Sequence, residues 1–176
     1  MKMSNTIFYT DFSSPLGKIT LTGTEDGLTG LAFEGQRYFD FEKARSGERR
    51  NDLPVFSETV LQLKRYFSGE KVCFGGIPVL PEGSSFRKTV WKLLCEIPYG
   101  EVTTYGEIAE KAAEKLGKKR MAAQAVGGAV GHNPISIIIP CHRVIGADGS
   151  LTGYGGGIER KKELLRLEGI DPDHRI

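Results

Sequence analysis

The chain has 176 residues, of which 39% are hydrophobic and 26% are charged, and its formal net charge is +2. This length accommodates one well-packed domain or two small ones, and the composition is that of an ordinary globular protein. No stretch approaches the roughly 18 apolar residues of a membrane span, and no signal-like segment follows Met1. We therefore expect a cytoplasmic protein that has no membrane partner.

The cysteines and histidines give no sign of a disulfide framework or a metal site. Cys73, Cys95 and Cys141 are odd in number and widely spaced, and His132 and His174 add no compact ligand set. We expect no metal and no cofactor. Residues 86–176 carry 14 basic against 11 acidic side chains, and this surplus points weakly toward a polyanionic partner.

The first half of the chain predicts a small sheet and one helix. Short apolar and polar stretches alternate between residues 6 and 35, with glycine-containing turns, which indicates three antiparallel strands. The charged residues 36–52 suggest a loop. Apolar residues at helical spacing predict a helix over residues 55–67, and residues 71–80 allow another strand. No residue pattern in this half suggests a catalytic site.

The segment Pro81-Glu82-Gly83-Ser84-Ser85 is the best candidate linker. We place a domain boundary there, with one domain at residues 1–83 and the other at 84–176. A serine of this segment can cap a helix that ends before Pro98. Cys95 lies one helical turn from Trp91, so we expect Cys95, and likewise Cys73, to be a core thiol.

Two helices joined by a glycine-containing turn follow. The sequence Thr104-Tyr105-Gly106-Glu107 has the form of a capping box, and Gly117 ends the helix that it opens. A second helix begins within residues 118–126, where Lys119 and Arg120 make its start basic. This pattern fits a DNA-binding helix-turn-helix, or equally two ordinary core helices.

Glycines in the second helix make its exposed face unusual. If the helix continues through Gly127 and Gly128, each glycine costs roughly 1 kcal/mol relative to alanine, and the face is nearly bare of side chains. Such a face lets a nucleic-acid backbone approach closely. Alternatively, Gly127 caps a helix that ends at Val126.

The apolar run Ile135-Ser136-Ile137-Ile138-Ile139 leads into Pro140, Cys141 and His142. It predicts a buried strand that the proline ends. A thiol reacts as thiolate, so a base must take its proton. His142 can do this through a water or after a bend, since neighbours on an extended chain face opposite sides. A carboxylate would orient the imidazole, and the candidates are Glu168, Glu163 and Asp148. These residues alone favour a packed cysteine over a nucleophile.

The end of the chain predicts a turn at residues 147–150, a glycine-rich loop at 153–157 and a final helix over 158–167. This helix carries a basic face, formed by Arg160, Lys161, Lys162 and Arg166. We expect residues 171–176 to be a frayed tail.

The motif Pro140-Cys141-His142-Arg143-Val144 resembles the active-site signature of the O6-alkylguanine-DNA alkyltransferases, also called methylated-DNA–protein-cysteine methyltransferases. Its flanks Gly131-His132-Asn133-Pro134 and Gly153-Tyr154-Gly155-Gly156-Gly157 match as well, and so does Gly100-Glu101-Val102-Thr103-Thr104-Tyr105. The resemblance extends from Ser84 to Gly169. It implies an α/β (α+β) fold with a small ribonuclease-H-like antiparallel-sheet domain and a mostly helical, winged-helix-like domain.

The resemblance implies a suicidal DNA-repair protein that flips out O6-alkylguanine and moves the alkyl group irreversibly to its own cysteine. Cys141 would be the acceptor, and His142 and Glu168 would form a water-bridged chain that removes its proton. Tyr105 would donate to N3 of the leaving guanine, and Asn133 would brace the helix-turn-helix against the active-site turn. O4-methylthymine is a further expected substrate.

The resemblance also implies how DNA is held. The carbonyl groups of Cys141 and Val144 would accept from the exocyclic amine of guanine, and Tyr154 and the amide of Gly155 would line the pocket. The second helix would enter the minor groove of double-stranded DNA, and a monomer suffices for one flipped base. Its contacts would come from Lys119, Arg120, Ala122, Ala123, Gln124, Ala125 and Gly128.

Three features depart from the pattern of the family. Gln124 stands where many members have an arginine that fills the gap left by the flipped base. Gly155 stands where some have serine, and no Cys or His precedes Cys73 to form the N-terminal zinc site of certain members. Two other classes of protein are alternatives to the alkyltransferase. A non-catalytic lesion binder of the same fold would lack Cys141, and a cysteine hydrolase would turn over without DNA.

Overall fold

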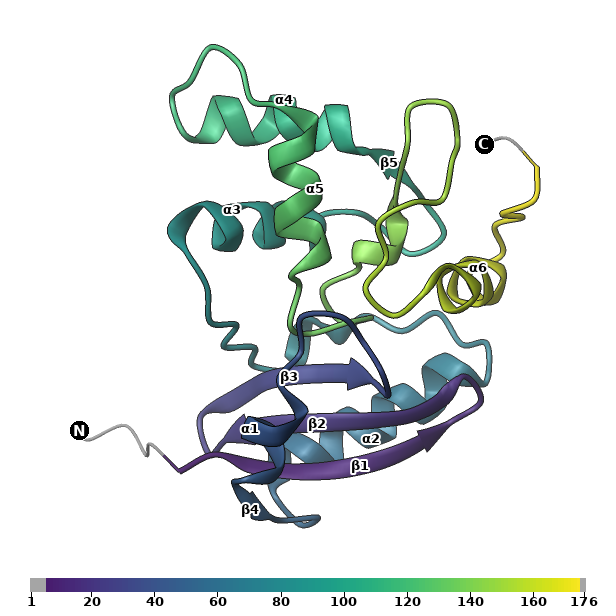
Figure 1. The fold of residues 1–176 in the computed structure, drawn as a ribbon. Coiled ribbons are helices and arrows are strands. Elements are labelled where there is room, and N and C mark those ends of the chain that lie inside the picture. Colours follow the sequence, from purple (N-terminus) through teal and green to yellow (C-terminus); the bar gives the residue numbers. More distant parts are fainter. Residues whose placement is uncertain (1–5, 175–176) are drawn as a thin grey trace.

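The computed structural model describes residues 6–174 (Figure 1). The N-terminal sheet and the helix α2 lie at one end of the molecule, and the helices α3, α4 and α5 lie at the other. The segment around Cys141 and the helix α6 lie between them. This is the mixed α+β architecture that the sequence predicts.

The three-stranded antiparallel meander is confirmed. It consists of β1 (Phe8–Ser14), β2 (Gly17–Thr24) and β3 (Gly27–Phe33), with the sheet order β3-β2-β1-β4. The expected helix is α2 (Pro54–Phe67), and it packs on this sheet. The core between them is apolar, and its fully buried members include Ile19, Leu21, Leu31, Phe33, Phe56 and Leu63.

Two segments of the N-terminal half differ from expectation. Residues 36–52 are not simply a loop, because they contain α1 (Phe41–Arg45) and β4 (Glu48–Arg49), which pairs in parallel with β1. The carboxylate of Asp40 accepts from the backbone N–H of Lys43 and so caps a helix too short to show apolar periodicity. Residues 71–80 form no strand. They contain the 3₁₀ turn η1 (Phe74–Gly76) and one bridge between Leu28 and Val79, since adjacent glycines and Pro78 disfavour a ladder.

The expected helices of the second half are present. They are α3 (Ser85–Leu94), capped by the Ser84 side chain, and α4 (Tyr105–Lys115), opened by the complete capping box of Thr104 and Glu107. The indole Nε1 of Trp91 donates to the carbonyl of Ala129 at 2.8 Å, which ties α3 to the helix α5.

The helix α5 (Ala123–Gly131) runs through the glycines, so the alternative that Gly127 caps it is wrong. Its buried residues Val126, Ala129 and Val130 pack against α3 and α4. This packing compensates for the low helix propensity of glycine.

The prediction of a strand over Ile135–Ile139 is wrong. Ile135 makes a single bridge to Leu31 of β3, the chain then turns, and Ile137 has a φ of +70°. Cys141 starts the 3₁₀ turn η2 (Cys141–Arg143), and only β6 (Val144–Ile145) is a strand, paired in parallel with β5 (Thr103–Thr104). The run is apolar because both halves of the molecule bury this turn, and periodicity does not separate that case from a strand.

The last helix, α6 (Ile158–Leu167), has the predicted bounds, but two of its cations face the protein. The guanidinium of Arg160 donates to the carbonyls of Leu16 and Glu34, and Lys161 is completely buried. The prediction of a frayed tail is wrong for residues 171–174, because Asp173 pairs with Arg166 and Lys162. The rest of that prediction, residues 175–176, lies outside the described residues.

Two further features concern the whole chain. Cys73 and Cys95 are exposed, so the expectation that they are core thiols is wrong. Cys95 is the C-cap residue of α3, where the apolar stripe of the helix no longer covers it. Within residues 6–174, no helix has the length and apolar character needed to cross a membrane.

Candidate active site and DNA-facing surface

Cys141 lies at the start of η2 and is only 4% exposed. Burial raises the pKa of its thiol, while the Asn133 side chain and the Lys161 ammonium act in the opposite direction. The thiol is thus protonated at rest and lies among groups that favour its anion. Such a sulfur needs a base to become a nucleophile.

The imidazole of the adjacent residue, His142, is the candidate for that base. Nε2 of His142 lies 2.5 Å from Oε2 of Glu168, and both side chains are fully buried. Burial lowers the pKa of His142, and the Glu168 carboxylate only partly offsets this, so the ring is neutral at pH 7 and Nε2–H donates to Glu168. Nδ1 has no hydrogen-bond partner among the described residues, which leaves its lone pair available for a proton.

Glu168 is the carboxylate that the structure brings to His142. Of the other two candidates, Glu163 pairs with Arg166, and Asp148 accepts from the backbone of Ser150. Burial raises the pKa of Glu168, but hydrogen bonds from His142 and Arg143 outweigh burial, and its pKa lies below the usual value.

Asn133 joins the end of α5 to the active-site turn. Its side-chain amide donates to the carbonyl of Ile139 at 2.7 Å, and its Oδ1 accepts from the backbone N–H of Ile135 at 3.0 Å. The bracing geometry expected for this residue is therefore present.

Tyr105 and Lys161 lie on another side of the sulfur. The Tyr105 hydroxyl donates to the carbonyl of Thr152 at 2.7 Å, and burial, with the charge of Cys141, raises its pKa to about 12. Nζ of Lys161 donates to the carbonyls of Val144 at 2.5 Å and Thr152 at 3.3 Å, and it lies 5.9 Å from the centre of the Tyr105 ring. Burial lowers the pKa of Lys161 to about 8, and Cys141 opposes this.

A groove of about 520 Å³ opens beside these residues. The loop 153–157, the second half of α5 and the loop after β3 form its walls. Tyr154 lines it while remaining only 7% exposed, and burial and the charge of Cys141 raise the pKa of Tyr154 well above its ordinary value. Gly155 also lines the groove. The groove thus reaches Tyr154, whose pKa is affected by the charge of Cys141.

The start of α5 presents small side chains to solvent. The exposed residues are Ala122, Ala123, Gln124, Ala125 and Gly128, and the preceding Lys119 and Arg120 are exposed too. A Cβ atom at Gly128 would meet no heavy atom within 4 Å. Packing inside the protein therefore does not explain the glycine at this position.

Comparison with known proteins covers nearly the whole chain. Residues 85–170 match the family model "6-O-methylguanine DNA methyltransferase, DNA binding domain", and residues 7–81 match its "ribonuclease-like domain". A methylated-DNA–protein-cysteine methyltransferase of Haemophilus influenzae is 45% identical, over 93% of this chain and 87% of that protein. One of Mycobacterium tuberculosis is 48% identical, over 92% of both chains.

A crystal structure of Mycobacterium tuberculosis OGT in complex with DNA aligns with a TM-score of 0.78 and 46% identity, over 92% of each chain. The chain belongs to the methylated-DNA–protein-cysteine methyltransferase family. It is accordingly a transferase of DNA repair, and its fold pairs a ribonuclease-like domain with a helical DNA-binding domain.

Sequence reasoning missed two residues of the methyltransferase site. Lys161 was assigned to a basic face, although it shares a helical stripe with the buried Leu164, Leu165 and Glu168, and this spacing was the signal available. Arg143 received no role. Its guanidinium binds Glu168 twice and donates to the carbonyl of Ile97 at 2.7 Å, and no pattern in the sequence reveals that partner.

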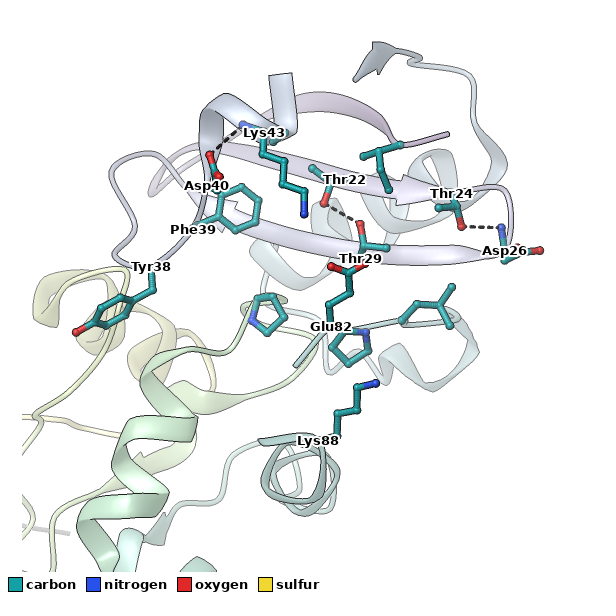
Figure 2. A pocket seen from close by; sticks show the side chains of 15 residues that line it. Thr22, Thr24, Asp26, Thr29, Tyr38, Phe39, Asp40, Lys43, Glu82 and Lys88 are labelled. Carbon is teal, nitrogen blue, oxygen red and sulfur yellow. Dashed lines mark hydrogen bonds between the residues drawn. The ribbon is translucent and has the colours of Figure 1, made fainter. Parts of the chain in front are cut away.

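A larger pocket of about 690 Å³ shares only Tyr38 with the residues that line the groove (Figure 2). Threonines of the sheet and charged side chains such as Asp40, Lys43 and Glu82 surround it. No cysteine or histidine is among the described residues that line it.

Proposed function

We propose that Cys141 accepts an alkyl group from O6 of guanine in double-stranded DNA and keeps it. The buried thiol beside the His142–Glu168 pair, with Nδ1 of His142 lacking a partner, carries this proposal. The family motif around Cys141 and the match to a DNA-binding domain support it.

The reaction is a displacement at the alkyl carbon. The thiol proton passes through a water to Nδ1 of His142, and Glu168 stabilises the imidazolium that forms. The sulfur then forms a bond to the alkyl carbon while the bond to O6 breaks. Tyr105 donates a proton toward N3, so that guanine leaves neutral, and the thiol proton replaces the one donated. A thioether is a poor leaving group, so one molecule makes one repair.

The target base must leave the duplex to reach this thiol. Flipping costs a few kcal/mol, and less for a mispaired lesion. The carbonyls of Cys141 and Val144 would accept from the exocyclic amine. Tyr154 and the amide of Gly155 would bound the pocket at O6. Methylated O4 of thymine presents a similar alkyl group, and we propose it as a second substrate.

We propose that α4 and α5 act as a helix-turn-helix whose second helix enters the minor groove. The small exposed residues Ala122, Ala123, Ala125 and Gly128 allow close approach. Lys119 and Arg120 would contact phosphates. Gln124 would fill the gap of the flipped base by hydrogen bonding, without the charge and stacking plane of an arginine.

We also propose that the domains divide at residues 83 and 84, that a monomer acts on each lesion, and that it works in the cytoplasm, where its thiols stay reduced. The family-model matches end at 81 and begin at 85, in support of this division.

The proposal is tested by weighing the protein after incubation with a duplex that contains O6-methylguanine. We expect one methyl group in place of one hydrogen, located at Cys141, with no turnover. Cys141→Ala should bind the same duplex and gain no mass. Tight binding by the unaltered protein without a change in mass would instead indicate a lesion binder, and repeated turnover would indicate a hydrolase.

A further inference from the structure

The loop after β3 carries an aromatic side chain that the hydrophobic core does not bury. Tyr38 is 67% exposed and has a φ of +62°. Among the described residues, Ile137 of the active-site turn is the only other non-glycine residue with positive φ. This conformation costs about 1–3 kcal/mol, and an exposed ring recovers little of that through burial. Tyr38 is therefore held in place for another reason.

The ring of Tyr38 stacks on a residue of the DNA-facing helix. Its centre lies 4.0 Å from that of the His132 ring, with 20° between the planes. Nδ1–H of His132 donates to the carbonyl of Gly128 at 2.7 Å, which fixes the imidazole. Figure 2 shows the Tyr38 ring turned away from Phe39 and Asp40. The stack thus joins the N-terminal sheet domain to the end of α5.

A guanidinium lies beside this stack. The Cζ atom of Arg37 lies 5.7 Å from the centre of the Tyr38 ring. The side chain is exposed, and it forms no ion pair with a carboxylate in residues 6–174. The backbone N–H of Arg37 donates to the carbonyl of Gly155 at 3.0 Å. The positive charge is thereby anchored to the loop that bounds the proposed lesion pocket.

All three residues line the groove of about 520 Å³ described above. Eight of the 13 residues that line it are glycines, and none is acidic. A groove with backbone walls, one guanidinium, one phenol and one imidazole suits a phosphodiester. The phosphate oxygens accept charge-assisted hydrogen bonds, and the glycines let the sugar-phosphate chain come close to the protein backbone.

We propose that Arg37, Tyr38 and His132 form a phosphate clamp that holds a backbone phosphate of the duplex flanking the lesion. This rests on the proposed function and gives the N-terminal domain a direct part in DNA binding. The guanidinium supplies charge, the phenol supplies a hydroxyl donor, and the stack with His132 positions both.

The clamp is tested with Arg37→Gln, Tyr38→Phe and Tyr38→Ala, measured by fluorescence anisotropy on duplexes with and without O6-methylguanine. A phosphate contact carries no sequence information, so Arg37→Gln should weaken both complexes alike, by roughly fivefold to tenfold at low salt, and reduce the salt slope by about 1. Tyr38→Ala should weaken binding more than Tyr38→Phe. The control Lys64→Gln removes one exposed charge from α2 and should leave the slope unchanged.

Single-turnover methyl transfer separates this inference from the proposed function. In the variants, the duplex concentration for half-maximal rate should rise, while the rate at saturating duplex stays that of the unaltered protein. Absence of transfer by the unaltered protein would refute the proposed function. Normal transfer with unchanged affinity and salt slope in Arg37→Gln, a variant that keeps the stack, would overturn the clamp alone.

Discussion

Two buried cations, Lys161 and Arg143, lie beside the residues proposed to react. The motif at residues 140–144 predicts Cys141 and His142, and the family resemblance selects Glu168 among three candidate carboxylates. The structure pairs His142 with Glu168 at 2.5 Å. Lys161 and Arg143 were missed because a lysine or arginine is ordinarily assigned to the surface. Here, buried carbonyls and the Glu168 carboxylate bind these cations, and such partners come from distant parts of the chain.

Lys161 should set the pH dependence of the thiol. Its buried ammonium favours the thiolate, so Lys161→Met should raise the pKa of Cys141 and move the rate of alkylation by iodoacetamide to higher pH. The rate is read at Cys141 by mass spectrometry, because Cys73 and Cys95 are exposed and react as well.

Lys162→Met is the matched control for that measurement. It removes the same charge from the next position of α6, where the side chain is partly exposed and pairs with Asp173. It should leave the pH profile of Cys141 in place. An equal shift in both variants would show that net charge, and not the position of Lys161, controls the thiol.

At the level of elements, helices with local signals were predicted well. The capping box of α4 and the apolar stripe of α6 lie within a few residues, and both helices have the expected bounds. The prediction of a strand for the isoleucine run failed because residues of two domains bury this run. Ile135 forms a bridge to β3, and the rest of the run lies in a turn. Only the tertiary structure distinguishes such a turn from a strand.

The helix α5 offers a prediction in which stability and binding change in opposite directions. At Gly128, a Cβ atom meets open space, so Gly128→Ala should stabilise the protein by about 1 kcal/mol through helix propensity. The same methyl group should weaken binding to duplex DNA several-fold by holding the minor groove away. Urea unfolding and fluorescence anisotropy measure the two effects.

Gly76→Ala is a matched control, since a Cβ atom there also meets open space, in η1 and away from α5. Its DNA affinity should be that of the unaltered protein. If Gly128→Ala stabilises the protein and binds DNA equally well, α5 does not approach DNA along this face.

At the level of the whole molecule, the active-site turn depends on contacts between its two halves. Leu31 of β3 donates to the carbonyl of Pro134 at 2.9 Å, and Ser136 donates back to Leu31 at 2.9 Å. The N-terminal sheet therefore holds one end of the segment that carries Cys141. The sequence alone gave this domain no function, because none of its residues looks reactive.

Arg160 is a further connection between the halves, and its loss should loosen them. Its guanidinium donates from α6 to the carbonyls of Leu16 and Glu34, and it lies 5.0 Å from the centre of the Phe33 ring. Arg160→Gln leaves these carbonyls short of donors and should destabilise the protein by about 2–3 kcal/mol. Since α6 also carries Lys161 and Glu168, the rate of methyl transfer should fall as well.

Limited proteolysis at the 81–85 segment measures this loosening directly. Cleavage there should be faster in Arg160→Gln than in Arg166→Gln. Arg166 is a control on the same helix, and within residues 6–174 its side chain pairs only with the nearby Glu163 and Asp173. Equal cleavage of the two variants would mean that the other contacts, among them the bridge through Leu31 and the stack of Tyr38 on His132, suffice to hold the halves together. In that case, a slower methyl transfer in Arg160→Gln would result from a change within α6 and not from looser contact between the halves.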